Sequence, residues 1–120
     1  MTKSKSTALS RGSRHGLGPA QIDAVAALFA VLSEPSRLCI LQVLQQAPAS
    51  VGELVKRTGF KQANVSKQLG ILAAAGVIAR RREGNLAIYS IVLPLVFDLC
   101  HLVCNGLATR ARAQADALRR

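Results

Sequence analysis

Three cysteines are the side chains with the most reactive chemistry in this 120-residue chain. Cys100 and Cys104 are four residues apart, so on a helix their sulfur atoms lie on one face and can approach each other. Cys39 stands alone, far earlier in the chain. Thiols bind soft metals, form disulfides and oxidise. Free cysteines are also common as small buried hydrophobes, so the sequence leaves both interpretations open.

The number of cysteines and the lack of a secretory or membrane segment predict that the protein works in a reducing compartment. Their number is odd, and the first 18 residues are basic but contain no apolar segment of the kind that a secretory signal needs. The longest apolar run, residues 91–102, is interrupted by Asp98 and is too short to cross a bilayer. We therefore expect a cytoplasmic protein with reduced thiols and no membrane partner.

Composition narrows the classes of function. A net charge of +10 suits a polyanionic partner. With three Phe, one Tyr and no Trp, the chain lacks aromatic side chains for stacking single-stranded bases, which weighs against RNA binding. There is no Cys-x-x-Cys, no carboxylate pair and no Gly-rich phosphate loop, so we expect no enzyme, a thiol enzyme included.

The segment 61–76 has the pattern of a DNA-recognition helix. At 3.6 residues per turn, Val65, Leu69 and Leu72 share one face, and the opposite face is small, polar and cationic with no carboxylate. Polar and basic side chains on such a face can hydrogen-bond base edges or phosphates, and small residues allow close approach. The candidate DNA-binding residues of this segment are Lys61, Gln62, Ala63, Asn64, Ser66 and Lys67.

The elements before this segment must present it. We expect helices over 19–32 and 35–46, each opened by a proline, with Leu38, Leu41, Leu44 and Cys39 of the second helix in the core. Ser50 and Glu53 form a capping box that opens a short helix, and Gly59 ends it. The tight turn at 58–61 then gives the spacing of a helix-turn-helix.

The segments after it predict a wing and a dimerisation helix. Strands over 77–83 and 86–91 flank a Gly-Asn turn, and the arginines between them alternate across the hairpin. The last helix, from Pro94 to about Leu118, is apolar on two sides, so we expect a second subunit to cover one of them. The wing adds to the candidate DNA-binding residues Arg80, Arg81, Arg82 and Asn85.

The predicted fold is therefore mainly α with a small β-hairpin. The order is α-α-α-α-β-β-α, a winged helix-turn-helix that we expect to form a homodimer and to bind double-stranded DNA. Residues 19–120 make up the DNA-binding and dimerisation domain, and residues 1–18 form a disordered basic tail.

Over roughly residues 20–107 the chain resembles the ArsR/SmtB family of winged-helix bacterial repressors. The resemblance implies a homodimer built on the first and last helices, a palindromic operator and release by an inducer. The motifs that carry the resemblance are Leu32-Ser33-Glu34-Pro35-Ser36-Arg37-Leu38, Val51-Gly52-Glu53-Leu54, Gln62-Ala63-Asn64-Val65-Ser66 and Arg80-Arg81-Arg82-Glu83-Gly84. The family pattern also includes Leu69, Leu72 and Tyr89.

The chain departs from the metal-binding members of this family. Metalloid sensors carry Cys-Val-Cys in the third helix, where this chain has residues 51–56 and no thiol. Zinc sensors use Asp and His pairs in the last helix, where this chain has only Asp98 and His101. Neither site can be carried over.

In this fold the helix of Cys39 packs near the last helix. Cys39, Cys100 and Cys104 would then form a trigonal sulfur site for As(III), Sb(III) or another soft ion. Alternatively Cys39 and one of the pair join through a disulfide or polysulfide. That arrangement resembles the persulfide-responsive branch, where the second-helix cysteine falls three residues later, at the position of Gln42.

The sequence thus predicts a repressor that requires no cofactor for DNA binding. Thiol modification or soft metal(loid) binding at the three cysteines would release it from its operator. The alternative is a constitutive or partner-controlled DNA-binding regulator with structural cysteines.

Overall fold

A computed structural model describes residues 16–119 of the chain. Most of the predicted basic tail, residues 1–15, and also Arg120 lie outside the described residues. The elements follow the predicted order with one added strand. In chain order they are α2 (Pro19–Leu32), α3 (Pro35–Gln46), β1 (Ala49–Ser50), α4 (Val51–Thr58), α5 (Gln62–Ala74), β2 (Ile78–Glu83), β3 (Leu86–Ile91) and α6 (Leu95–Arg119).

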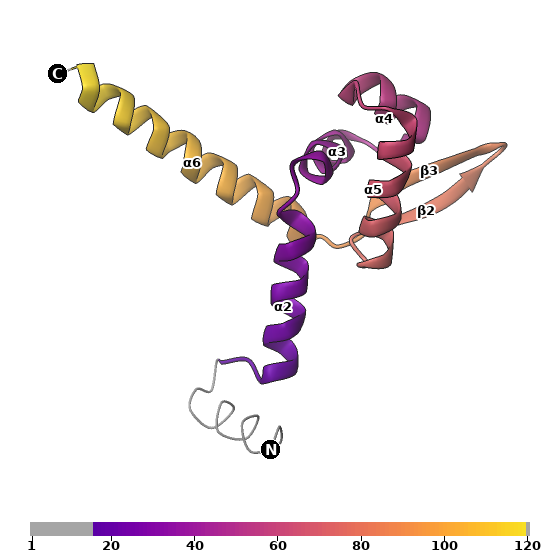
Figure 1. Cartoon of the computed structure of the whole chain (residues 1–120), viewed down its shortest axis with the longest axis horizontal. Coiled ribbons are helices and arrows are strands. Elements are labelled where there is room, and N and C mark those ends of the chain that lie inside the picture. The colour runs from indigo at the N-terminus through magenta and orange to yellow at the C-terminus, as the bar shows by residue number, and fades with distance from the viewer. Residues whose placement is uncertain (1–15, 120) are drawn as a thin grey trace.

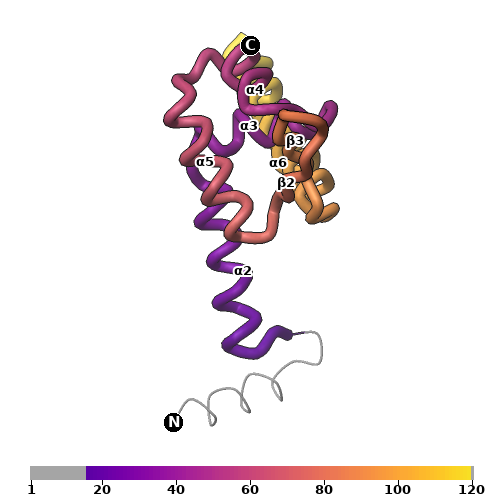
Figure 2. The backbone as a smooth tube through the Cα atoms, turned by 90° about the vertical axis from the view of Figure 1, so that its right-hand side faces the viewer, coloured from indigo at the N-terminus to yellow at the C-terminus, as the bar shows by residue number. Residues whose placement is uncertain are grey.

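The chain folds into a body with two arms. Helices α3, α4 and α5 and the hairpin β2–β3 make up the body, and α2 and α6 leave it in different directions (Figure 1). Turned by 90°, α2 extends well beyond the body (Figure 2). The molecule measures 52 × 51 × 21 Å, and its radius of gyration is 18.5 Å. A compact domain of this length has a radius of gyration of roughly 14 Å, so the arms hold much surface away from the body.

The sheet has three antiparallel strands in the order β1-β3-β2. The predicted hairpin is confirmed, with Arg81 opposite Ile88 and a turn at Gly84, whose φ of 61° is the left-handed conformation that glycine adopts easily. Strand β1 pairs Ala49 with Tyr89 and was not predicted, because two residues are too short to show an alternating pattern.

The core lies between α3, α4, α5 and the start of the hairpin. The predicted apolar face of α5 is confirmed, since Val65, Leu69 and Leu72 are all buried. Helices α3 and α4, strands β1 and β2, the residue just before β2 and the two arms supply the other buried apolar residues, which are Leu32, Ile40, Leu41, Leu44, Ala49, Leu54, Val77, Ile78 and Val96.

The predicted core face of α3 was wrong at two positions. Leu38 is 42% exposed and Cys39 is exposed, whereas Ile40 is fully buried. Residues 40, 41 and 44 share the buried face of α3, the helix that packs against α4 and α5. Leu38 and Cys39 lie on the neighbouring face, which looks toward α2 and α6.

Both arms carry apolar side chains that the body does not cover. In α2 the predicted stripe is present, but Ile22, Val25 and Phe29 are exposed and only Leu32 is buried. In α6 only Val96 is buried, and every residue from His101 to Arg119 is exposed. These apolar faces have no partner within the described part of one chain.

No single helix among residues 16–119 is both long and apolar enough to cross a membrane, and α2 and α3 meet that test only as a pair bent by 88°.

Burial of the α5 face should dominate the stability of the body. Leu69 is 1% exposed and Leu86 is 58% exposed. Leu69→Ala should lower the free energy of unfolding by about 2–5 kcal/mol, because it removes buried methyl groups and leaves a cavity. Leu86→Ala is the matched control, with an expected change within about 0.5 kcal/mol. Urea unfolding at one fixed protein concentration measures both, and equal losses would contradict the assigned core.

Candidate nucleic-acid interface and thiol pocket

The turn between α4 and α5 is held by local hydrogen bonds. Gly59 has a φ of 77°, and its N–H donates to the carbonyl of Val55 over 2.9 Å. The Thr58 hydroxyl donates to the carbonyl of Leu54 over 2.6 Å and accepts from the N–H of Phe60 over 3.2 Å. At the start of α4, the capping box predicted for Ser50 and Glu53 is confirmed. These bonds define where α4 ends and α5 begins.

Helix α5 presents a polar face to solvent. Because Val65, Leu69 and Leu72 are buried, the opposite side chains must point outward. Asn64 is half-buried, and the exposed side chains of the predicted set in this region are Lys61, Gln62, Ala63, Ser66 and Lys67. Helix α5 contains no carboxylate, and its N-cap residue, Lys61, makes no side-chain cap. Its first N–H groups therefore remain available to an anion.

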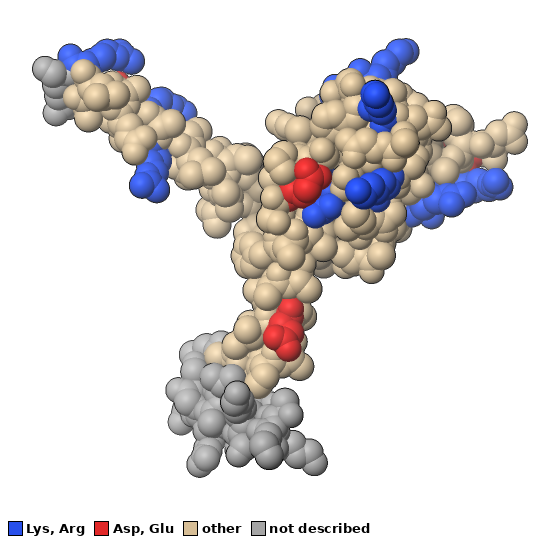
Figure 3. Space-filling model, viewed as in Figure 1, with Lys and Arg blue, Asp and Glu red and all other residues tan. Residues whose placement is uncertain are grey.

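The three arginines of the hairpin differ in whether an acidic side chain pairs with them. Arg81 donates from Nε and Nη2 to Oε2 of Glu83, over 2.8 and 2.5 Å. Arg80 and Arg82 point to the opposite face of the strand, and neither has a salt-bridge partner within residues 16–119. Asn85 is exposed at the turn. Figure 3 shows basic side chains over the body and along the hairpin.

A polar chain behind α5 was missed by the sequence analysis. Arg37 of α3 donates from Nε to the carbonyl of Val31 over 2.6 Å and from Nη1 to Oε1 of Gln68 over 2.8 Å. Gln68 donates from Nε2 to Oδ1 of Asn64 over 3.0 Å. The i, i+4 spacing of Asn64 and Gln68 was the one available signal. The position of Arg37 depends on tertiary packing.

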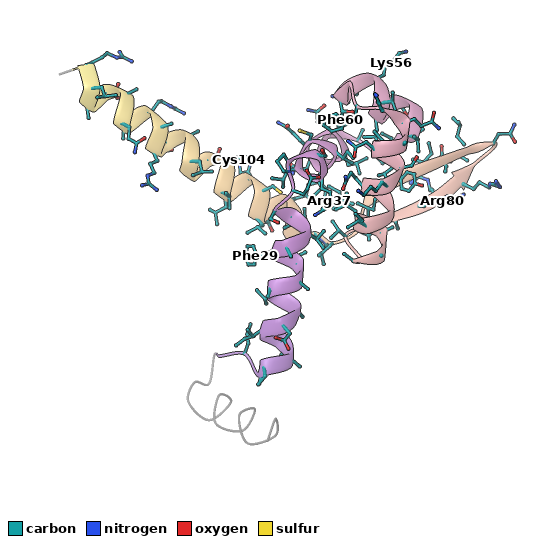
Figure 4. The ribbon with its side chains drawn as sticks, in the orientation of Figure 1. Phe29, Arg37, Lys56, Phe60, Arg80 and Cys104 are labelled. Atoms are coloured by element: carbon teal, nitrogen blue, oxygen red, sulfur yellow. The ribbon has the colours of Figure 1, made fainter. Side chains whose placement is uncertain are left out.

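The three cysteines line one open pocket between α2, α3 and α6. Its volume is about 720 Å³, and its wall is mostly apolar. Phe29 lies on α2 and Cys104 on α6, the two arms that border the pocket (Figure 4). The pocket therefore brings together the sequence-distant thiols that the prediction joined. Its lining residues are Phe29, Leu32, Ser33, Leu38, Cys39, Gln42, Gln45, Leu99, Cys100, His101, Val103, Cys104 and Leu107.

The thiols differ in exposure and in proton affinity. All three are free, with Cys39 and Cys104 exposed and Cys100 half-buried. Burial raises the pKa of the Cys100 thiol, as does the negative charge of a Cys104 thiolate, while the Gln45 side chain opposes the shift. Within residues 16–119, no group of three His, Cys, Asp or Glu side chains is placed to hold a metal ion. The three-thiolate site is thus not assembled within one chain.

A DNA-binding helix, a basic hairpin after it and two apolar arms define the class of winged helix-turn-helix regulators. A helix-turn-helix domain model matches residues 32–81. The HTH-type transcriptional regulator Rv0081 of Mycobacterium tuberculosis is 41% identical over 92 residues, which cover 76% of this chain and 78% of that protein. Its crystal structure matches with a TM-score of 0.63 and 37% identity, over 85% of this chain and 99% of that one.

Two further relatives extend the comparison. The probable mercury resistance operon repressor of Streptomyces lividans is 35% identical over 91 residues, covering 76% of this chain and 73% of that protein. The solution structure of the homodimeric winged helix-turn-helix domain of Mb0332 from Mycobacterium bovis, a possible ArsR-family regulator, matches with a TM-score of 0.68 and 29% identity. That match covers 76% of this chain and 87% of the other.

The chain is a DNA-binding transcriptional regulator, and it belongs to the ArsR/SmtB family of winged helix-turn-helix proteins. The predictions of the family and of the fold class are confirmed. The prediction that it is not an enzyme agrees with this family, whose members are transcriptional regulators.

The pocket geometry predicts an order of thiol reactivity. At pH 7.5, iodoacetamide should modify Cys39 and Cys104 before Cys100, because Cys100 is less exposed in one chain and burial raises the pKa of its thiol, which lowers its share of reactive thiolate. At pH 9, Cys104→Ser should accelerate alkylation of Cys100, because it removes a neighbouring negative charge that raises the pKa of the Cys100 thiol. Peptide mass spectrometry follows each site, and modification of Cys100 first would contradict this order.

Proposed function

We propose that this protein is a homodimeric transcriptional repressor whose helix α5 reads operator DNA in the major groove. The observation that supports the proposal most strongly is that α5 has an exposed face without carboxylates opposite a fully buried apolar face. Gln62, Asn64, Ser66 and Lys67 contact base edges or phosphates, Lys61 reaches a phosphate, and Ala63 allows close approach. Such a regulator works in the cytoplasm, where the chromosome is.

The hairpin supplies contacts that do not depend on sequence. Arg80 and Arg82 have no acidic partner among the described residues and are the better candidates for phosphate contact. Glu83 already offsets the charge of Arg81, which lies on the other strand face. Asn85, at the exposed tip, reaches the DNA backbone beyond the groove that α5 occupies.

The two arms form the dimer interface. Ile22, Val25 and Phe29 on α2 and Leu102 and Leu107 on α6 are large, apolar and exposed in one chain. A second copy would cover these faces, and the related domain of Mb0332 is homodimeric. Two-fold symmetry then places two copies of α5 about 34–36 Å apart, in successive major grooves.

The thiol pocket controls release. It lies where α3, which packs against α5, meets both arms, so a group attached there changes the angle between the body and the dimer interface. We favour covalent modification of Cys39 or Cys104, such as persulfidation, because the thiols of one chain do not form a three-ligand metal site. The Streptomyces lividans relative is a probable mercury resistance operon repressor, and mercury is a soft metal that thiolates bind, which supports thiol chemistry as the class of signal.

Substitutions on α5 and the hairpin should separate base contacts from phosphate contacts. Lys67→Ala should weaken operator binding by about 1–3 kcal/mol if the side chain reads a base. Arg80→Ala should weaken binding to every duplex and lower the salt slope by about one, and Arg81→Ala, with its charge offset by Glu83, should do less. Fluorescence anisotropy at several salt concentrations measures both effects. An unchanged affinity in Lys67→Ala would remove that residue from the interface.

Thiol control is tested by binding before and after modification. Treating the reduced protein with a polysulfide salt should weaken operator binding by about 5- to 150-fold, and a reductant should restore it. A variant with all three cysteines changed to serine should bind DNA and not respond. Arsenite, added separately, tests the metalloid alternative. Confirmed modification with no change in binding would leave a constitutive regulator with structural cysteines.

A further inference from the structure

Arg37 stands at the junction of α2, α3 and α5, behind the proposed DNA-binding face (Figure 4). We infer that Arg37 is a positioning residue that determines which atoms of the Asn64 amide face the DNA. It acts through Gln68, and neither Arg37 nor Gln68 needs to touch DNA. This inference rests on the proposed function, since it concerns how α5 reads its operator.

The direction of the hydrogen bonds follows from the chemistry of arginine. A guanidinium group has only donors, so the Gln68 amide must turn its oxygen toward Arg37. The Gln68 nitrogen is then directed at Asn64, whose oxygen must accept from it. As a result the Asn64 amide nitrogen, with its two hydrogens, remains for the outward side. Three hydrogen bonds in series thus connect the carbonyl of Val31, through Arg37 and Gln68, to the Asn64 side chain at the DNA end.

Burial prevents a single amide from turning around. Gln68 is 6% exposed, and Arg37 and Asn64 are half-buried. If Asn64 alone were flipped, its NH2 group would face the NH2 group of Gln68, leaving a buried donor without an acceptor. The four groups therefore keep one common direction, and Asn64 presents donors.

A side chain that presents donors selects acceptors. In the major groove these are O6 and N7 of guanine, N7 of adenine and O4 of thymine, while the N4 amino group of cytosine is a donor and is disfavoured. Arg37 thereby contributes to specificity for one base pair in each half-site. The body offers a comparison, since Arg57 donates to Gln46 over 2.5 Å in an exposed pair that leads to no residue of α5.

The first experiment measures the coupling between Arg37 and Asn64 in DNA specificity. Affinities are compared on a duplex that the wild-type protein selects from a random library and on a scrambled duplex of the same composition. Arg37→Met should lower the ratio of the two affinities by roughly ten-fold. In an Asn64→Ala background the same change should have no further effect on the ratio, because the two residues act as one unit. Arg57→Met is the matched control, and it should leave the ratio unchanged.

The second experiment tests the direction of the hydrogen bonds between Arg37, Gln68 and Asn64. Gln68→Glu keeps an oxygen for Arg37 but removes the donor, so the Asn64 amide turns around and presents its oxygen to DNA. The DNA sequences that this variant selects from a random library should differ from those that the wild-type protein selects at one base pair of each half-site. At that base pair, a hydrogen-bond donor on the base edge should replace an acceptor. An unchanged library would overturn the assigned direction.

Three outcomes of the coupling experiment are decisive. Equal losses on both duplexes, or losses that multiply in the double variant, would show that Arg37 only supports the fold. If thermal unfolding shows that Arg37→Met does not fold, Gln68→Met is used in its place, because it breaks the same series of hydrogen bonds at its centre. A wild-type protein with no preference between the duplexes would refute the proposed function, and this inference with it.

Discussion

The rotation of α5 about its own axis is the constraint on which the rest of the molecule depends. Val65, Leu69 and Leu72 are buried against α3 and α4, so the helix cannot turn without exposing them to water. That burial points Gln62, Ser66 and Lys67 outward. The Arg37–Gln68–Asn64 chain adds a polar restraint from the same side. Hydrophobic burial thus selects the face, and hydrogen bonds orient one side chain at its edge.

The arms and the pocket follow from what the body does not cover. The arms contribute only Leu32 of α2 and Val96 of α6 to the buried core, which leaves most of their apolar side chains exposed in one chain. The pocket forms where these arms leave α3, and its thiols therefore lie between the element that supports α5 and the elements available to a second copy. In the proposed function, modification of Cys39 or Cys104 would act on both without contact with the DNA-binding face.

Local signals in the sequence predicted most of the fold. Pro35, the Ser50–Glu53 capping box and Gly59 act within a few residues, so the helix ends they mark agree with the structure. Leu38 and Cys39 were misplaced because a helical stripe can be drawn through either of two adjacent faces of α3, and only the packing of α5 decides between them. The Arg37 chain depends on residues distant in sequence, which no local pattern can reveal. The meeting of Cys39 with Cys100 and Cys104 in one pocket was expected only from the family resemblance.

The most direct test of the account is DNA cleavage by an iron chelate tethered to α5. The chelate is attached at Ser66→Cys in a protein whose three natural cysteines are changed to serine, on the operator duplex. The account predicts two symmetric clusters of strand cleavage about 34–36 Å apart, one from each copy of α5 in a major groove. A chelate tethered at Leu118→Cys, on the exposed end of α6, should give no such clusters. A single cluster, or the same pattern from both tethers, would contradict it.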